Sequence, residues 1–227
     1  MKRFRRHWWL GAFVLIASSA RAATLNDTLA RMDQAAAHFT SLSADLRRVA
    51  HTDVINEDMV DMGTIQMKRS KGHDVRMFLD IQKPDPKQVL IDTKRVELYY
   101  PDSLLEQIYD LTGKYKSLVD QFLLLGFGST SAELESSYTI SLGGTEVING
   151  ERATRLQLTP KSPEVLTHLK RVDLWLSDQT GLPLQQKFYE PSGDYQLATY
   201  TNIKINPNLP ELKLDLPRGV KKEYPLK

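Results

Sequence analysis

The chain has 227 residues, of which 41% are hydrophobic and 26% are charged, values typical of a globular protein and not of a disordered chain. It contains no cysteine, which excludes disulfides, thiol catalysis, cysteine-ligated metals and a cysteine-anchored lipid. The formal net charge is +2, but five of the 30 basic residues lie in the first 22 positions, and the remainder holds 25 basic against 28 acidic residues. This acidic remainder gives no electrostatic reason to expect a nucleic acid as a partner.

The N-terminus has the organisation of an export signal. Residues 2–6 are rich in Lys and Arg, residues 8–17 form an apolar run, and Ala20, Arg21 and Ala22 follow as a small-x-small cleavage site. The apolar run has ten residues, about half of what is needed to span a bilayer. We therefore predict that residues 1–22 are a signal peptide cleaved near Ala22, which leaves a soluble exported protein. The alternative is an uncleaved membrane anchor.

Two segments have a helical period. Thr24 with Asp27 three residues on resembles a helix cap, and apolar residues then recur at spacings of four, three, four and three, at Leu25, Leu29, Met32, Ala36 and Phe39. This pattern predicts an amphipathic helix over residues 24–39. A second helix is expected over residues 115–125, ended by two glycines, and a short helical turn over residues 163–169.

The rest of the chain alternates between apolar and polar residues, which is typical of strands. Asn149 and Gly150 form a two-residue hairpin signal. We count about ten strands, mostly linked by hairpins, in one domain over residues 23–227. If a sheet of this size curls without closing, its concave face is apolar and needs a cover. The two helices could be permanent core at this mouth, or a movable lid over a cavity that holds lipid.

Residues that would mark an enzyme do not gather in the sequence. Four histidines of the mature chain, His38, His51, His73 and His168, lie far apart, and no close pair suggests a metal site. The segment 126–129 fails both the GxSxG and the GxGxxG patterns, so we interpret it as a helix stop followed by a polar loop. We predict no catalytic residue, no metal and no cofactor. A pair of carboxylates brought together by the fold stays an open alternative.

Several segments, in order, resemble the periplasmic outer-membrane lipoprotein carriers of the LolA family, and the resemblance covers nearly the whole mature chain. They are Phe39 to Ala44 after the first helix, Gly63 to Arg69, Pro84, Val96 to Pro101 and the tail Leu214 to Val220. The resemblance implies an α+β, mainly β fold: a single open, strongly curved antiparallel half-barrel of about ten strands with amphipathic helices covering its mouth.

The resemblance also implies a function. The protein would be a non-enzymatic periplasmic carrier that binds the acyl chains of lipoproteins or lipids and moves them from an inner-membrane exporter to an outer-membrane acceptor, acting as a monomer. A lipid-binding module that serves a lipid exporter or senses envelope stress is the second hypothesis. A secreted hydrolase is the third.

The site residues follow from the same resemblance. The matching Arg of the family reaches from the sheet to the lid helices and holds the empty form closed, a role that falls here on Arg69; the alternative is a solvated Arg at the end of a strand. The residues expected to line the acyl cavity share inward-facing, apolar character, and plain core is the alternative for each of them: Ile65, Met67, Val75, Met77, Leu79, Leu98, Tyr100, Leu118 and Phe122.

Overall fold

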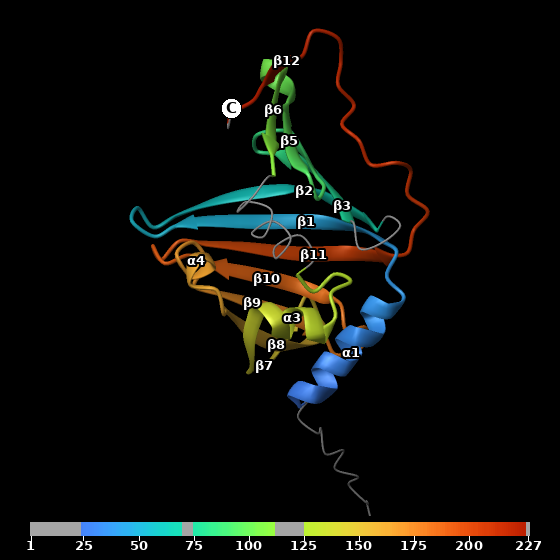
Figure 1. Ribbon diagram of the computed structural model, residues 1–227, viewed down its shortest axis with the longest axis vertical. Coiled ribbons are helices and arrows are strands. Elements are labelled where there is room, and N and C mark those ends of the chain that lie inside the picture. Colours follow the sequence, from blue (N-terminus) through green and yellow to red (C-terminus); the bar gives the residue numbers. More distant parts are fainter. Residues whose placement is uncertain (1–23, 70–74, 112–124, 226–227) are drawn as a thin grey trace, which may run out of the picture.

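The described part of the protein is one large sheet with a few short helices (Figure 1). The computed structural model describes residues 24–69, 75–111 and 125–225. Its strands are β1 (Ser41–Thr52), β2 (Glu57–Arg69), β3 (Val75–Lys83), β4 (Lys87–Ile91), β5 (Arg95–Tyr100), β6 (Leu105–Asp110), β7 (Tyr138–Ile148), β8 (Glu151–Pro160), β9 (Arg171–Ser177), β10 (Pro183–Tyr189), β11 (Tyr195–Ile205) and β12 (Lys221–Glu223). Its helices are α1 (Leu25–Ala37), α3 (Ser131–Ser137), α4 (Pro163–Leu166) and the 3-10 turn η1 (Pro101–Ser103).

The strands are ordered β12-β6-β5-β4-β3-β2-β1-β11-β10-β9-β8-β7. Neighbours in sequence pair as antiparallel hairpins within β1–β6 and within β7–β11, and the pairing of β1 with β11 joins the two halves. The predicted class, a mainly β protein built on an open antiparallel sheet, is confirmed. The described sheet has twelve strands instead of about ten, and β12 pairs with β6 in parallel. A three-residue strand is too short for alternation to reveal it.

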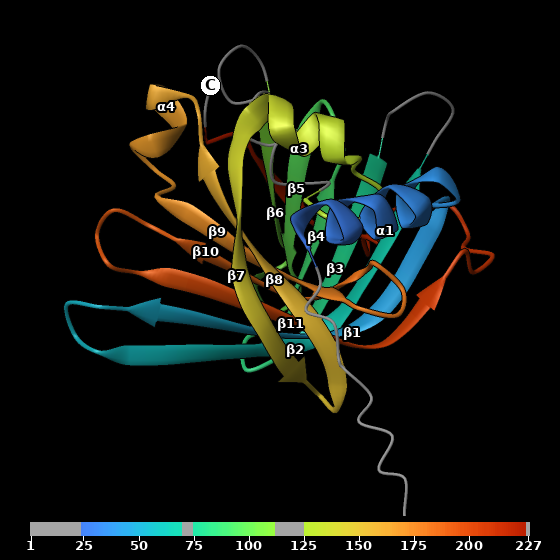
Figure 2. The ribbon, with the colours of Figure 1, turned by 90° about the horizontal axis from the view of Figure 1, so that it is seen from below.

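The sheet curves, with α1 and α3 on one side of it (Figure 2). The register shifts by one residue in four strand pairs, β1 with β11, β2 with β3, β9 with β10 and β7 with β8. Such bulges bend a strand and increase its twist. On the β11 side of the first pair the extra residue coincides with Asn202, which has a φ of 51°. The curvature therefore has a local cause in each half of the sheet.

Helix α1 forms as its sequence predicts. The Thr24 hydroxyl accepts a hydrogen bond from the Asp27 amide at 3.2 Å, and the Asp27 carboxylate accepts one from the Thr24 amide at 3.3 Å. The helix buries Leu29, Met32 and Ala36, one turn apart on one face. The first two pack in the same cluster as apolar side chains of β8 and β9, so α1 covers the inner face of that half of the sheet.

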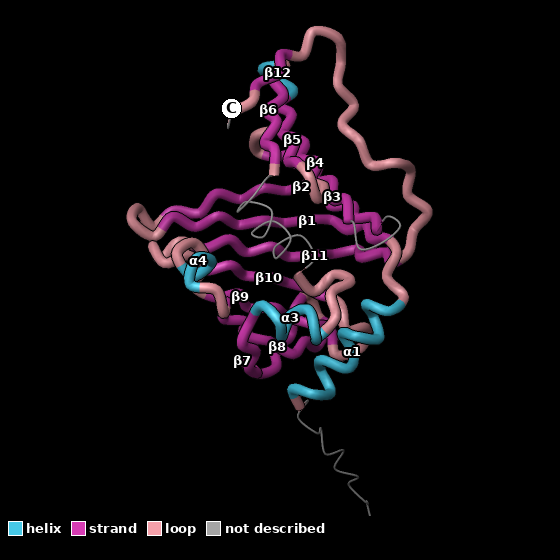
Figure 3. Tube along the Cα trace, in the orientation of Figure 1, coloured by secondary structure: helices cyan, strands magenta, loops and turns pink. Residues whose placement is uncertain are grey.

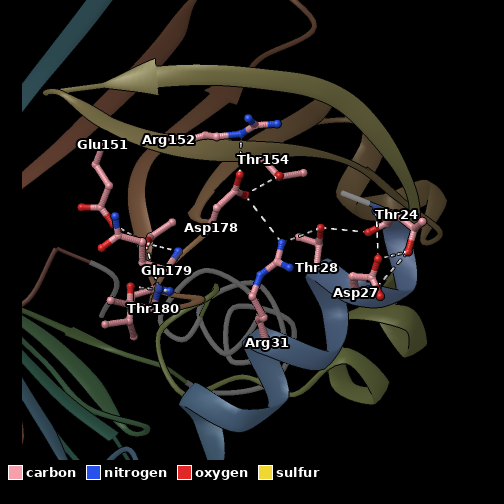
Figure 4. Close-up of polar contacts among 12 residues, drawn as sticks. Thr24, Asp27, Thr28, Arg31, Glu151, Arg152, Thr154, Asp178, Gln179 and Thr180 are labelled. Atoms are coloured by element: carbon pink, nitrogen blue, oxygen red, sulfur yellow. Dashed lines mark hydrogen bonds and ion pairs between the residues drawn. The ribbon is translucent and has the colours of Figure 1, made fainter. Parts of the chain in front are cut away.

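A polar cluster fixes α1 to the turn between β9 and β10 (Figure 4). The Arg31 guanidinium lies 3.6 Å from the Asp178 carboxylate, which also accepts a hydrogen bond from the Thr154 hydroxyl at 2.6 Å and lies 3.0 Å from Nε of Arg152. In the same turn, a Cβ on Gly181 would lie 2.5 Å from the Arg31 carbonyl oxygen. The close approach of helix and turn therefore requires a glycine.

Residues 206–220 run as a loop from the end of β11 to β12 at the far edge of the sheet (Figure 3). Asn206 begins this loop: its side chain accepts a hydrogen bond from the Thr40 amide at 2.8 Å and donates one to the His38 carbonyl at 2.7 Å. Further along, Lys68 and Arg76 donate to backbone carbonyls of the loop at 2.8 and 3.1 Å. Side chains of β2 and β3 thus hold the tail against the sheet.

Two local predictions were wrong. The polar stretch after Gly128 contains α3, which begins with a capping box between Thr130 and Glu133 that the sequence interpretation missed. The two strands expected over 138–142 and 145–148 are one strand, β7, with a bulge at its glycines. The helix expected over 115–125 lies outside the described residues, except for Leu125. None of the described helices is long and apolar enough to cross a membrane.

Candidate functional site

The residues expected to face inward from the first half of the sheet share one face. Met67 pairs directly with Met77, and Ile65 pairs with Leu79. Val89 of β4 pairs with Leu79 on one side and with Leu98 of β5 on the other. Directly paired residues point to the same side of a sheet, and Val75 and Tyr100 follow by the alternation of their strands. Leu118 and Phe122 lie outside the described residues.

Burial divides this set into two groups. Ile65, Met67 and Val75 are buried, whereas the members on the outer strands are only half-buried, namely Met77, Leu79, Leu98 and Tyr100. In β5 the buried side chains are Glu97 and Tyr99 on the opposite face. The first group is part of a closed core, and the second leaves apolar surface on the inner face that a ligand could contact.

Three further half-buried residues extend this apolar surface across β4 and β5. Ile91 pairs with Met77 and with Val96, and Val89 pairs with Leu79 and with Leu98. The sequence analysis recognised these segments as strands but did not assign these side chains to a face. Val89 and Ile91 are two residues apart, so the alternation of the strand would have placed both side chains on one face.

A buried loop, residues 125–129, lies against the inner face of the sheet. Leu125 is 1% exposed and Phe127 is 2% exposed. The Phe127 ring packs edge-on against the Tyr200 ring of β11, with centroids 5.0 Å apart. Two glycines, Gly126 at φ 85° and Gly128 at φ 76°, take left-handed conformations that other residues rarely adopt. The interpretation as a polar loop was wrong, and the apolar residues beside the glycines were the signal that it missed.

Arg69 at the end of β2 reaches this loop. Its guanidinium donates a hydrogen bond to the Gly128 carbonyl and lies 5.5 Å from the centroid of the Phe39 ring. A Cβ on Gly128 would lie 2.7 Å from the guanidinium and 2.6 Å from Phe39, so the absence of a side chain there permits the contact. Nε of Arg69 is buried and has no hydrogen-bond partner among the described residues. The Arg thus contacts the segment just before α3.

A second donor, which the sequence analysis missed, holds the other end of the loop. Gln186 of β10 is 6% exposed, and its side-chain amide donates a hydrogen bond to the Leu125 carbonyl. Its oxygen accepts one from the Tyr200 hydroxyl at 2.7 Å. Burial raises the pKa of Tyr200 well above its ordinary value, so this hydroxyl stays a donor. The available signal was a Gln two residues before an apolar Phe188; both pair with apolar residues of β9, Gln186 with Leu174 and Phe188 with Val172.

A charged cluster lies toward the other end of β2, eight residues before Arg69. The Asp61 carboxylate is 2% exposed, and Nε of Arg48 on β1 lies 3.0 Å from it. Nζ of Lys87 on β4 lies 3.7 Å from the same oxygen. Two cations around one buried carboxylate keep the charges paired. The strands therefore carry an ion cluster at one end and the Arg69 contact at the other.

The described histidines do not form a catalytic arrangement with one another. His51 stacks on Tyr195 with centroids 4.6 Å apart and lies 2.8 Å from the Asp58 carboxylate, across the β1–β2 hairpin. No three His, Asp or Glu side chains within the described ranges are placed to hold a metal ion. The inner face offers apolar surface and hydrogen-bond donors, a chemistry suited to binding.

Comparison with known proteins shows likeness at the level of the fold. No protein-family model matches the chain, and no curated protein matches its sequence. Among solved structures, MucB is similar over 82% of this chain and 60% of its own, at 19% identity and a TM-score of 0.50. An uncharacterized conserved protein from Thermus thermophilus is similar over 88% of this chain and 98% of its own, at 14% identity and a TM-score of 0.52.

A LolA superfamily protein from Nitrosomonas europaea matches over 83% of this chain and 96% of its own, at 16% identity and a TM-score of 0.39. This likeness is one of fold at low identity, and the resemblance to the LolA family that the sequence motifs indicated stays a prediction. The chain spans about 60% of the length of MucB.

Proposed function

We propose that this protein is a non-enzymatic periplasmic carrier that holds the acyl chains of lipoproteins or lipids on the inner face of its sheet. The observation that carries the proposal is the half-buried apolar surface over β3–β5, next to a buried loop that two polar side chains hold in place. Such a surface can accept hydrocarbon, and such a loop can be exchanged for it. The resemblance of the sequence motifs to the LolA family supports the same function.

The physics of the cargo explains why a carrier needs this arrangement. Moving an acyl chain from water into an apolar site gains about 0.8 kcal/mol for each CH₂. A lipid with two chains therefore does not cross water unaided at a useful rate. A carrier must bind it and still release it, which favours adaptable apolar surface over a tight pocket. Met77 of β3, which is half-buried on this face, supplies a flexible side chain of that kind.

Arg69 acts in this proposal as the latch of the empty form. A guanidinium in an apolar mouth needs oxygen acceptors, and the Gly128 carbonyl supplies one in the structure. Cargo that enters must displace the loop and break this bond. Cargo that leaves allows the bond to form again, so closure of the empty carrier favours release.

The proposal includes the route. Residues 1–22 are removed on export, residues 23–227 form the carrier domain, and the protein acts as a monomer between an inner-membrane exporter and an outer-membrane acceptor. A lipid-binding module that serves a lipid exporter or senses envelope stress stays the second hypothesis. No observation favours the third hypothesis, a secreted hydrolase.

The test measures first which ligand the purified protein carries and then whether an acylated peptide displaces a bound probe. Protein purified from the periplasm is examined by native mass spectrometry, and we expect an acylated ligand to be bound to part of it. The emptied protein should bind a fluorescent fatty-acyl probe, and an acylated peptide should displace that probe. A protein that carries no ligand and binds no probe would contradict the proposal.

A variant pair locates the binding surface. Met77→Asp puts a charge on the half-buried inner face and should weaken probe binding at least tenfold, because a buried charge deters hydrocarbon. Gln82→Asp is the control, since Gln82 is exposed on the same strand. Equal probe binding by a folded Met77→Asp protein would remove β3 from the site.

A further inference from the structure

The loop 125–129 carries the chemical features of a ligand. It presents apolar side chains, Leu125 and Phe127, to the inner face of the sheet, and both are almost completely buried. It also presents two backbone carbonyls, those of Leu125 and Gly128, to side-chain donors of the sheet. An apolar body with carbonyl oxygens at defined points is also the description of an acyl ester or amide.

The two donors come from opposite halves of the sheet. Arg69 ends β2 and Gln186 lies in β10, with β1 and β11 between them in the strand order. Each is bound to the loop, and the contacts span 59 and 61 positions of sequence. They are side-chain donors that hold opposite ends of one short segment.

The orientation of the Gln186 amide follows from its partners. The Leu125 carbonyl can only accept, so Nε2 of Gln186 must face it, and Oε1 then accepts from the Tyr200 hydroxyl at 2.7 Å. Tyr200 thereby fixes Gln186 with its donor directed at the place that the loop occupies. When the loop leaves, this donor and the guanidinium of Arg69 lose their acceptors, and buried unpaired donors are costly.

We propose that the loop 125–129 is a stand-in for the cargo, and that Gln186, with Arg69, binds a carbonyl oxygen of the ester or amide that joins each acyl chain to its headgroup. This inference rests on the proposed function and adds to it the class of group recognised. The protein then prefers acyl esters and amides over hydrocarbon chains joined by ethers. Gln186 is the specificity-determining residue, and Tyr200 is a positioning residue that acts through it.

The experiment compares two short-chain glycerophospholipids that have the same headgroup and chain length, one a diester and the other a diether. Both are measured as monomers by displacement of a fluorescent fatty-acyl probe. The wild-type protein should bind the diester at least fivefold more tightly, the factor that one hydrogen bond contributes. In Gln186→Leu this preference should fall roughly fivefold.

The ratio of the two affinities isolates the carbonyl contact. Loss of the bond to Leu125 also makes the closed form less stable, but this change affects both lipids equally and cancels in the ratio. Gln185→Leu is the matched control, since Gln185 is the adjacent residue on the opposite face of β10 and bonds Thr199. It should keep the wild-type preference.

The outcomes separate the two proposals. Equal binding of diester and diether by the wild-type protein overturns this inference and leaves the acyl carrier intact. Binding of neither lipid, and of no fatty-acyl probe, contradicts the proposed function itself. If Gln186→Leu lowers or raises both affinities by the same factor, Gln186 only holds the loop, and the inference is wrong.

A second variant covers the case in which Gln186→Leu does not fold. The double variant Gln186→Leu, Tyr200→Phe removes both members of the buried polar pair, so no hydroxyl is left without its acceptor. It should show the same roughly fivefold loss of preference. An unchanged preference in the folded double variant overturns the inference.

Discussion

Arg69 lies where the apolar inner face of the sheet meets the buried loop, and its bonds connect the two. Its guanidinium contacts the Gly128 carbonyl and the Phe39 ring, and its Nε has no partner among the described residues. Among the described residues this guanidinium has one carbonyl acceptor, which it could exchange for a carbonyl of the cargo. In the proposed function, the residue belongs to the part of the molecule that changes when cargo enters.

We predict that Arg69→Leu destabilises the empty, closed form and raises the affinity for a fatty-acyl probe about threefold to tenfold, since opening no longer breaks a charged hydrogen bond. Transfer of a labelled lipoprotein from the loaded variant to acceptor membranes should slow. Arg69→Lys should not restore it, because an ammonium lacks the planar fork. Arg47→Leu, at an exposed position of β1, is the control. Unchanged affinity and transfer would show that Arg69 is a structural strand-end residue.

Tyr138 gives a prediction in alkaline solution. Burial raises the pKa of its hydroxyl from 10.0 to about 12. The unfolded chain therefore loses this proton first as the pH rises above 10, and the folded state loses about 2 to 3 kcal/mol of stability by pH 12. Below pH 10 the hydroxyl is protonated in both states and the effect vanishes.

Denaturant unfolding of the wild-type protein and of Tyr138→Phe at several pH values checks this. The Phe variant should match the wild type within about 1 kcal/mol at pH 7, because the buried hydroxyl has no hydrogen-bond partner among the described residues. It should become the more stable of the two above pH 10. Parallel stability curves across this range would mean that the hydroxyl is not buried as described.

At the scale of elements, the loop 125–129 and helix α3 form one unit. The Asp33 carboxylate of α1 accepts hydrogen bonds from the Ser131 amide and hydroxyl at 2.6 and 2.7 Å. The start of α3 is thereby fixed to α1, and α1 is fixed to the β9–β10 turn through Arg31 and Asp178. In the proposed function, a displaced loop therefore pulls on the start of α3, and the anchoring of this start to α1 favours the return of the loop.

Gly128→Ala tests how tightly this unit is packed. The new Cβ would lie 2.6 Å from Phe39 and 2.7 Å from Arg69, at a φ of 76°. We expect a loss of about 2 to 4 kcal/mol in the free energy of unfolding, part from the strained backbone and part from the clash. Gly150→Ala is the matched control, because Gly150 has a φ of 84° and open space around it. Equal losses in both variants would show that the contact with Arg69 and Phe39 is loose.

At the scale of the molecule, Asn206 connects the segment that leads into β1 with the segment that follows β11. It follows β11, has a φ of 54°, and bonds the segment between α1 and β1, more than 160 positions earlier. The same residue begins the tail that crosses to β12. One side chain therefore sets both where the first strand starts and where the last part of the chain departs.

We expect Asn206→Ala to lower the free energy of unfolding by about 1 to 2 kcal/mol, because it removes the hydrogen bonds with the Thr40 amide and the His38 carbonyl. Chemical denaturation measures this loss. Asn202→Ala is the control, since Asn202 has a similar φ of 51° but bonds a single side chain, that of Asp45 on the neighbouring strand. A loss no larger than that of the control would mean that water replaces these bonds at little cost.

The sequence by itself determined those features that depend on local pattern. Alternation located the strands of both halves, and the pairing of Thr24 with Asp27 located the start of α1, because caps and periods act over a few residues. The same alternation placed Ile65 and Met67 on one face of their strand, and Met77 and Leu79 on one face of the next strand. Arg69 was singled out by resemblance of its surroundings to a family, and its contact with a carbonyl fits that expectation.

Only the tertiary structure decided which segments meet. The alternation of apolar and polar residues predicts which side of a strand a residue faces, but it does not predict which distant strand or loop lies opposite that residue. The pairing of β1 with β11, the burial of the loop 125–129 and the bond from Gln186 to Leu125 join parts that lie far apart in sequence. The sequence alone predicts that Gly128 helps to end a helix, whereas the structure places Arg69 and Phe39 against it. A polar residue on an apolar face acquires its role from the acceptor that the fold brings to it.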